Sequence, residues 1–203
     1  MKIICVGRNY GLHAAELGNE VPQEPVLFLK PDSALVPKNN PFIIPAFSKD
    51  IHYECELVIR IGRAGKHIQK KFAHRYIHSI GLGIDFTARD LQQELKSKGL
   101  PWEKAKAFDG AAFVGDLLPA ASFGDLQSLR FQLLKNGLPV QDGFTGDMLF
   151  SIPTLVEEIS KYFMLKIGDL IFTGTPAGVG KVEPGDQLEG MLEGQKNFSL
   201  NIR

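Results

Sequence analysis

The chain has 203 residues, of which 44% are hydrophobic and 23% are charged, a composition typical of one globular domain spanning residues 1–203. Lysine plus arginine and aspartate plus glutamate balance at 23 each, so the net charge gives no support for binding nucleic acid or an anionic membrane. No apolar run approaches the roughly 18 residues of a membrane helix, and the apolar run near the N-terminus is too short for a signal peptide. Two cysteines, Cys5 and Cys55, do not form a disulfide framework, so we expect a reduced, cytoplasmic protein.

The first part of the chain is predicted to be rich in short strands, because glycine and proline interrupt its apolar runs. Asn9 is expected to cap a short helix over residues 10–17, and the four prolines of residues 31–50 predict an irregular loop. Residues 72–78 are expected to form a short helix or connector. Strands are predicted for IICV (3–6), PVLFLKP (25–31), YECELVIRIG (53–62) and SIGLGIDF (79–86).

The second part contains the two principal helices. TARDLQQELKSKG (87–99) has the clearest helical period, with Thr87 as its expected cap and Gly99 as its end. Residues 100–116 are predicted to be a loop, residues 129–143 a hairpin about an Asn-Gly turn, and residues 152–163 an amphipathic helix. Strands follow at 169–176 and in a final pair before residue 203. The order lacks strict strand–helix alternation, so the predicted fold class is α+β, mostly β.

The stretch HYECELVIR places two glutamates in an otherwise apolar strand. Alternate strand residues share a face, so Glu54 and Glu56 point the same way, about 6.5–7 Å apart at their Cα atoms. Two carboxylates on a buried face repel each other and lose hydration. Either a divalent cation compensates them, or the strand lies at a solvated edge of its sheet.

Asp85 ends another apolar strand, where it either caps the following turn or joins the two glutamates. Together, Glu54, Glu56 and Asp85 are hard oxygen ligands suited to Mg²⁺, Mn²⁺ or Ca²⁺. Cys55 is expected to point away from them, so zinc is not favoured. Three carboxylates would leave about three positions of an octahedral ion for water and substrate, which is typical of a catalytic site.

Two further features have open interpretations. His13 and Glu16 lie three residues apart on the expected short helix, where they form either a base dyad or a surface ion pair. Gln92 points either toward Asp85 or into water. TGTPAGVGK (173–181) does not fit the phosphate-loop template in its glycine spacing or in the residue that follows the lysine.

Seven sequence blocks occur in an order that resembles the fumarylacetoacetate hydrolase family, in particular its short members that include acylpyruvate hydrolases and oxaloacetate decarboxylases. The resemblance runs from about residue 3 to the end of the chain. The blocks are VGRNYGLHAAEL, PVLFLKP, HYECELVI, GIDFTARDLQ, GLPWEKAKAFDG, FSIP and GDLIFTGTPAGVG.

This resemblance implies a mixed β-roll that forms a homodimer and holds Mg²⁺ or Mn²⁺. It assigns the metal carboxylates to Glu54, Glu56 and Asp85, and a His–Glu dyad on a mobile lid to His13 and Glu16. The site lysine matches Lys106 rather than Lys104, and the site glutamine matches Gln92. The residues expected to line the substrate pocket are Arg8, Asn9, Tyr10, Lys30, Arg89 and Thr175.

The implied activity is metal-dependent hydrolysis of a C–C bond in 2,4-dioxo acids such as acetylpyruvate or fumarylpyruvate, giving pyruvate and a carboxylic acid. His13, oriented by Glu16, would activate water, while Lys106 and Gln92 would stabilise the oxyanion. Decarboxylation of oxaloacetate and tautomerisation need the metal-stabilised enolate but no attacking water. The alternatives are an isomerase or hydratase of 2-oxo dioic acids in aromatic catabolism, and a non-catalytic Ca²⁺- or Mg²⁺-binding module.

Overall fold

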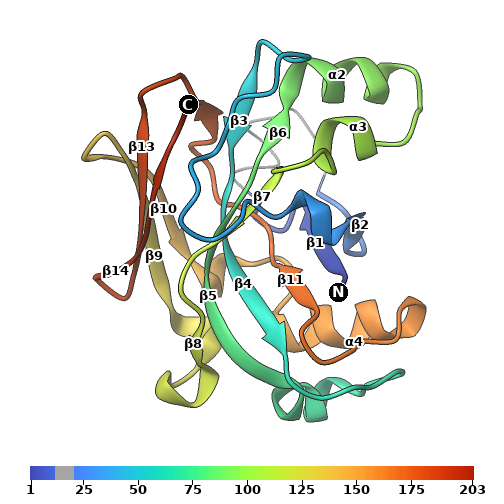
Figure 1. Cartoon of the computed structure of the whole chain (residues 1–203). Helices are drawn as coiled ribbons and strands as arrows, with labels where there is room; N and C mark the ends of the chain where they lie inside the picture. Colours follow the sequence, from blue (N-terminus) through green and yellow to red (C-terminus); the bar gives the residue numbers. More distant parts are fainter. Residues whose placement is uncertain (12–20) are drawn as a thin grey trace.

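The computed structural model describes residues 1–11 and 21–203. Its strands form three sheets (Figure 1). The largest has the order β2-β1-β11-β4-β5-β7, with β8 also paired to β5; the second has the order β10-β9-β13-β14; and the third has the order β12-β3-β6. The α+β, mostly β prediction is confirmed.

The helices and strands have the following bounds. The largest sheet contains β1 (Ile3–Gly7), β2 (Val26–Lys30), β4 (Cys55–Ile61), β5 (Ile77–Asp85), β7 (Ala112–Val114), β8 (Leu118–Pro119) and β11 (Leu170–Phe172). The second contains β9 (Arg130–Lys135), β10 (Leu138–Phe144), β13 (Gln187–Leu192) and β14 (Gln195–Asn201), and the third contains β3 (Ile51–Tyr53), β6 (Thr87–Ala88) and β12 (Gly180–Lys181). The α-helices with described bounds are α2 (Arg89–Ser97), α3 (Glu103–Lys106) and α4 (Ile152–Tyr162).

The main core lies between the two larger sheets, which face each other across the middle of the molecule (Figure 1). Leu57 and Ile59 of β4 pack into this core together with Phe131 of β9 and Leu188 of β13. Val58, between the two β4 residues, belongs to a second cluster with residues of β1 and β11. Since alternate strand residues point to opposite faces, β4 is buried on both faces. It pairs with β11 on one side and with β5 on the other, so it is an internal strand of its sheet.

Two predicted elements match the structure closely. The hairpin of β9 and β10 turns at Asn136 and Gly137, whose φ angles of 53° and 79° are those of a type I′ turn. The amphipathic helix predicted at 152–163 is α4, whose apolar face is buried through Leu155 and Ile159. In both cases the local sequence contains the whole signal.

Three predictions about secondary structure were wrong. The strand predicted at 53–62 is interrupted at Glu54, which lies between β3 and β4, two strands of different sheets. Thr87 does not cap α2: it belongs to β6, where it pairs with His52, and its hydroxyl accepts a hydrogen bond from Lys106. The predicted loop at 100–116 contains α3 and β7, which are too short for any periodicity to be read. The helix predicted over residues 10–17 falls largely outside the described residues.

Glycine allows the close packing of β5 against its neighbours. Gly83 lies opposite Glu56 in the β4–β5 ladder. A Cβ atom there would lie 2.6 Å from the carbonyl oxygen of Phe113 and 2.7 Å from a methyl group of Val58. The GLG sequence at 81–83 therefore has a packing role in this sheet.

Asp169, the residue before β11, forms polar contacts that hold the N-terminal segment beside this strand. Its carboxylate accepts hydrogen bonds from the backbone N–H groups of Lys2 and Lys166, at 2.9 Å and 2.8 Å, and forms an ion pair with the Lys2 ammonium. Burial alone would raise the pKa of Asp169, but these interactions outweigh it and hold that pKa below its usual value. The stabilisation is therefore present above about pH 4, the ordinary range of an aspartate in an unfolded chain, and is lost as the pH falls through the lower folded-state pKa.

We expect Asp169→Asn to lower the free energy of unfolding at pH 7 by about 1.5–3 kcal/mol, the contribution of hydrogen bonds to a charged group. This corresponds to a fall in Tm of roughly 2–4 °C per kcal/mol for a chain of this size. The difference in Tm between variant and wild type should shrink at pH 3. Thermal melting at both pH values tests this, with the exposed Asp142→Asn as control; an equal deficit at pH 3 would contradict the ionic contribution.

Candidate metal centre

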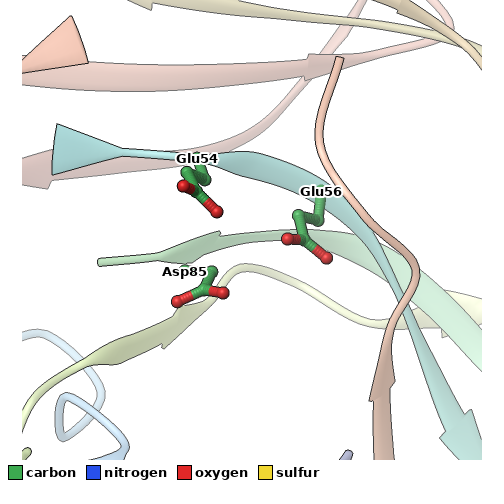
Figure 2. A group of neighbouring side chains, drawn as sticks. All are labelled: Glu54, Glu56 and Asp85. Carbon is green, nitrogen blue, oxygen red and sulfur yellow. The ribbon is translucent and has the colours of Figure 1, made fainter. Parts of the chain in front are cut away.

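Three carboxylates meet beside the first residues of β4 and the last residue of β5 (Figure 2). Glu54 comes from the junction before β4, Glu56 from β4 itself, and Asp85 from the last position of β5. One oxygen from each lies within 4.8 Å of the others. Their exposed fractions are only 5%, 2% and 1%, and β4 lies between β11 and β5. The alternative of a solvated edge strand is therefore excluded.

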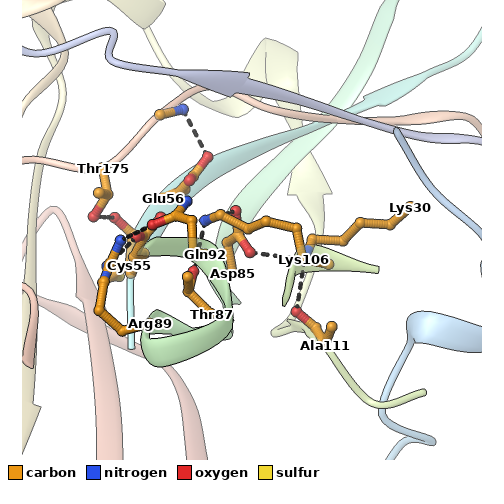
Figure 3. Close-up of polar contacts among 12 residues, drawn as sticks. Lys30, Cys55, Glu56, Asp85, Thr87, Arg89, Gln92, Lys106, Ala111 and Thr175 are labelled. Atoms are coloured by element: carbon orange, nitrogen blue, oxygen red, sulfur yellow. Dashed lines mark hydrogen bonds and ion pairs between the residues drawn. The ribbon is translucent and has the colours of Figure 1, made fainter. Parts of the chain in front are cut away.

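Three cationic side chains compensate part of this negative charge (Figure 3). The Lys106 ammonium lies 2.8 Å from Glu54 Oε2 and 2.9 Å from Asp85 Oδ2. The Lys30 ammonium lies 2.7 Å from the other Asp85 oxygen, and Arg89 Nη2 lies 2.5 Å from Glu54 Oε1. The cations come from β2, α3 and the start of α2, so the tertiary fold assembles the cluster.

All three hydrogens of the Lys106 ammonium have acceptors. Besides the two carboxylates, Thr87 Oγ1 accepts at 2.6 Å. Burial alone would lower the pKa of Lys106, but attraction from Asp85 and Glu54 outweighs it, so the pKa is raised and the side chain is a cation at neutral pH. Lys104, the other lysine of this segment, is exposed. The choice of Lys106 as the lysine within the site matches its position in the structure.

Glu56 is the least compensated of the three acids. Its Oε2 accepts the backbone N–H of Gly174 at 2.6 Å, and within residues 1–11 and 21–203 it has no ion pair with a lysine or arginine. Burial, followed by repulsion from Asp85 and Glu54, raises the pKa of this carboxyl well above its usual value. A cation placed among the three acids would offset the free-energy cost of the buried Glu56 charge.

The donor set fits a divalent ion. Carboxylate oxygens are hard ligands that suit Mg²⁺, Mn²⁺ or Ca²⁺, and these three converge from separate backbone segments without a thiol or imidazole among them. Cys55 is buried in the core cluster, as expected for a residue pointing away from the acids. Within the described part of the chain, this is the one group of three such side chains close enough to hold a metal ion.

A small pocket opens beside the acids and is lined on one side by α2. Arg89 donates from Nη1 to the Gln92 side-chain oxygen at 2.6 Å, and both line the pocket with Lys96. Of the two orientations left open for Gln92, this placement agrees with the one toward the acids, as the family resemblance implied. The other residues around the pocket are Val6, Gly7, Arg8, Phe28, Trp102, Lys106 and Thr175.

Lys96 and Trp102 were missed by the sequence reasoning. Lys96 lies four residues after Gln92 and seven after Arg89, so all three share one face of α2. That spacing is a signal that the sequence already contains. Trp102 precedes α3 and its ring lies 6.1 Å from that of Phe28, a tertiary contact that no local pattern indicates.

The remaining predicted residues are placed as follows. Arg8 lines the pocket with a φ of 60°, a left-handed conformation that is uncommon for a side chain of this size and is often found at functional sites. Asn9 is fully buried and bonds the backbones of Phe150 and Thr173, Tyr10 is buried in the core, and Lys30 lies behind the acids, paired with Asp85. Contrary to the prediction, these three residues do not line the pocket. His13 and Glu16 lie outside the described residues, and their roles stay predictions.

No helix in the part of the chain that the structure describes is long and apolar enough to cross a membrane.

Comparisons with known proteins agree over nearly the full chain. A family model described as "Fumarylacetoacetate (FAA) hydrolase C-terminal" matches residues 2–200. "Oxaloacetate tautomerase FAHD1, mitochondrial" of Mus musculus is 41% identical over 201 residues, covering 99% of this chain and 91% of the relative. "Oxaloacetate tautomerase YcgM" of Escherichia coli K12 is 42% identical over 194 residues, covering 95% and 89%.

Among solved structures, a fumarylpyruvate hydrolase from Pseudomonas aeruginosa in complex with Mn²⁺ and pyruvate has a TM-score of 0.94 and 36% identity, covering 100% of this chain and 89% of that chain. A putative family protein from Yersinia pestis CO92 has a TM-score of 0.96 and 41% identity, covering 100% and 93%. These likenesses confirm the β-roll architecture that the sequence resemblance implied. This chain belongs to the fumarylacetoacetate hydrolase family.

Proposed function

We propose that this protein is a divalent-metal-dependent enzyme of 2-oxo dicarboxylic acids, and that it interconverts the keto and enol forms of oxaloacetate. The observation that carries the proposal is the buried triad of Glu54, Glu56 and Asp85, which lies at the base of a pocket lined by cationic side chains. Two relatives above 40% identity are named oxaloacetate tautomerases, which supports the same chemistry.

The charge of the pocket favours a dianionic substrate. Arg8, Arg89, Lys96 and Lys106 line it together with the three acids, so the described lining residues already include one more cation than anion. Burial, and to a smaller extent the positive charges of Arg8 and Arg89, lower the pKa of Lys96. A substrate with a second carboxylate would be attracted by Arg8 and Arg89 as well as by a bound ion, whereas a monoanion such as acetylpyruvate has only one carboxylate for them.

The residues themselves supply binding, orientation and charge. Glu54, Glu56 and Asp85 would hold the ion, whose chemistry is that of a Lewis acid toward a 2-oxo group. Lys106, held as a cation, contacts two of the three acids, Glu54 and Asp85, and it can turn to a substrate oxygen when it releases one of its three present acceptors. Gln92 and Arg89 hold each other at the pocket wall and so present a fixed polar surface.

Tautomerisation is the first candidate because the described residues supply a polarising site and cations that stabilise an enolate oxygen. The proton that moves between the carbon and the enol oxygen would be carried by water in the pocket. Hydrolytic C–C cleavage of acylpyruvates is the second candidate. It is supported by the likeness to the fumarylpyruvate hydrolase structure, and it additionally requires activated water, which the prediction assigns to His13 and Glu16.

One assay tests the proposal and separates the two candidates. Purified protein is mixed with the enol form of oxaloacetate and Mg²⁺ or Mn²⁺; loss of the enol absorbance is followed, and pyruvate is measured in the same sample. We expect rapid, metal-dependent loss of enol without matching pyruvate release, and abolition by EDTA. A faster release of pyruvate from fumarylpyruvate than loss of enol from oxaloacetate would favour the hydrolase. Activity that EDTA does not affect would contradict the metal centre.

A further inference from the structure

A buried amide from the second sheet contacts the segment that contains the acids. Gln141 of β10 is 2% exposed. Its Oε1 accepts the backbone N–H of Cys55 at 2.9 Å, and its Nε2 donates to Thr175 Oγ1 at 2.8 Å and to the Pro176 carbonyl at 2.9 Å. One side chain therefore joins two segments that are 120 residues apart in sequence, Cys55 and Thr175.

Thr175 closes this arrangement into a ring. Its hydroxyl donates to the Cys55 carbonyl at 2.8 Å (Figure 3) while it accepts from Gln141. Both backbone polar groups of Cys55, the residue between Glu54 and Glu56, are thus held by one amide and one hydroxyl. The single hydroxyl proton of Thr175 is engaged with Cys55, so this hydroxyl cannot donate to a substrate oxygen while the ring is intact.

The same turn reaches Glu56 by a second route. Gly174, next to Thr175, donates its backbone N–H to Glu56 Oε2 at 2.6 Å. Its φ of 99° belongs to the left-handed region, and a Cβ atom there would lie 2.7 Å from Asn9 Cβ. Gln141 bonds the two residues that follow Gly174, so the position of that N–H depends on the amide.

The backbone of β10 is irregular at this point. The β9–β10 register shifts between Pro139 and Gln141, as at a β-bulge. Gly178, beyond the turn, comes so close to this bulge that a Cβ atom there would lie 2.2 Å from the Val140 carbonyl oxygen. Bulges redirect side chains and are frequent beside active sites, and this one accompanies the amide that bonds to Cys55 and the 174–176 turn.

We propose that Gln141, acting with the Thr175 hydroxyl, is a positioning residue that fixes Glu54 and Glu56 in the orientation needed to hold a metal ion. The inference rests on the proposed function, in that these acids bind the ion. Hydrogen-bonding partners behind metal ligands commonly contribute 10- to 100-fold to metal affinity. An amide whose polar atoms all bond behind the acids, and none of which lines the pocket, fits this role.

The test is the affinity of metal-free protein for Mn²⁺, measured from free Mn²⁺ by electron paramagnetic resonance. We expect Gln141→Leu to weaken binding about 10- to 100-fold. Thr175→Val, which keeps the side-chain shape, should weaken it similarly, and the double variant should lose little more than either alone, because both changes open the same ring.

Asn197→Leu is the matched control. Asn197 is also a buried amide of the second sheet: it accepts the Leu82 N–H at 2.9 Å and donates to the Asp116 carbonyl at 2.8 Å, away from the acids. Its loss should lower Tm without changing Mn²⁺ affinity. If Gln141→Leu folds and binds Mn²⁺ with wild-type affinity, the positioning role is wrong while the metal centre stands. If that variant does not fold, unchanged Mn²⁺ affinity in Thr175→Val would likewise overturn the positioning role. Wild-type protein that binds no Mn²⁺ would instead defeat the metal centre itself.

Discussion

Glu56→Gln is expected to abolish measurable Mn²⁺ binding and to reduce turnover of oxaloacetate at least about 100-fold, while raising the Tm of the metal-free protein. Lewis-acid stabilisation contributes several kcal/mol, and each 1.4 kcal/mol corresponds to a tenfold rate. Glutamine keeps an oxygen able to accept the Gly174 N–H, but it removes a buried charge that Asp85 and Glu54 repel. Loss of function and gain in stability should therefore appear in one variant.

Isothermal titration with Mn²⁺, steady-state rates and thermal melting of the metal-free form measure the three effects. Each kcal/mol gained in unfolding free energy should raise Tm by roughly 2–4 °C. The control is Glu183→Gln, which neutralises an exposed glutamate and should change none of the three. A lower Tm for Glu56→Gln would mean that the Glu56 charge is compensated in the metal-free protein, contrary to the geometry of the site.

Lys106→Met should separate catalysis from metal binding. Losing a preorganised donor at the reacting oxygen typically lowers turnover about 10²–10³-fold. Mn²⁺ affinity should be retained or increased, because Lys106 attracts the Glu54 and Asp85 oxygens that a metal ion would also attract. Removing one partner of a buried ion pair should cost about 3–5 kcal/mol of unfolding free energy in the metal-free form, and added Mn²⁺ should restore part of it.

Lys104→Met is the matched control for this prediction. Lys104 is exposed and lies two residues before Lys106, so its removal should alter neither turnover nor Mn²⁺ affinity. If Lys106→Met lost Mn²⁺ binding to the same degree as Glu56→Gln, the lysine would be required for assembly of the acids rather than for catalysis. Unchanged turnover would exclude it from the reaction.

The sequence alone was sufficient for features whose physical signal is local. Glu54 and Glu56 alternate with apolar residues, which predicts one shared face; the Asn136–Gly137 pair predicts the hairpin; and residues 152–163 have the apolar period of a helix. The apolar strand that ends at Asp85 indicated a third acid, the family resemblance added Lys106, and the structure brings all four side chains together.

Only the tertiary structure decided whether the glutamates are exposed and what surrounds them. Burial of β4 between β11 and β5, the break at Glu54, and the ring of Gln141, Thr175 and Cys55 all depend on contacts between distant segments. Such contacts produce no periodic pattern in the sequence. Thr87, for example, was predicted to cap a helix, but in the structure it lies in β6, which pairs with β3, and its hydroxyl accepts from Lys106. Periodicity reports which face of an element a residue occupies, whereas burial and charge compensation depend on what the rest of the fold places against that face.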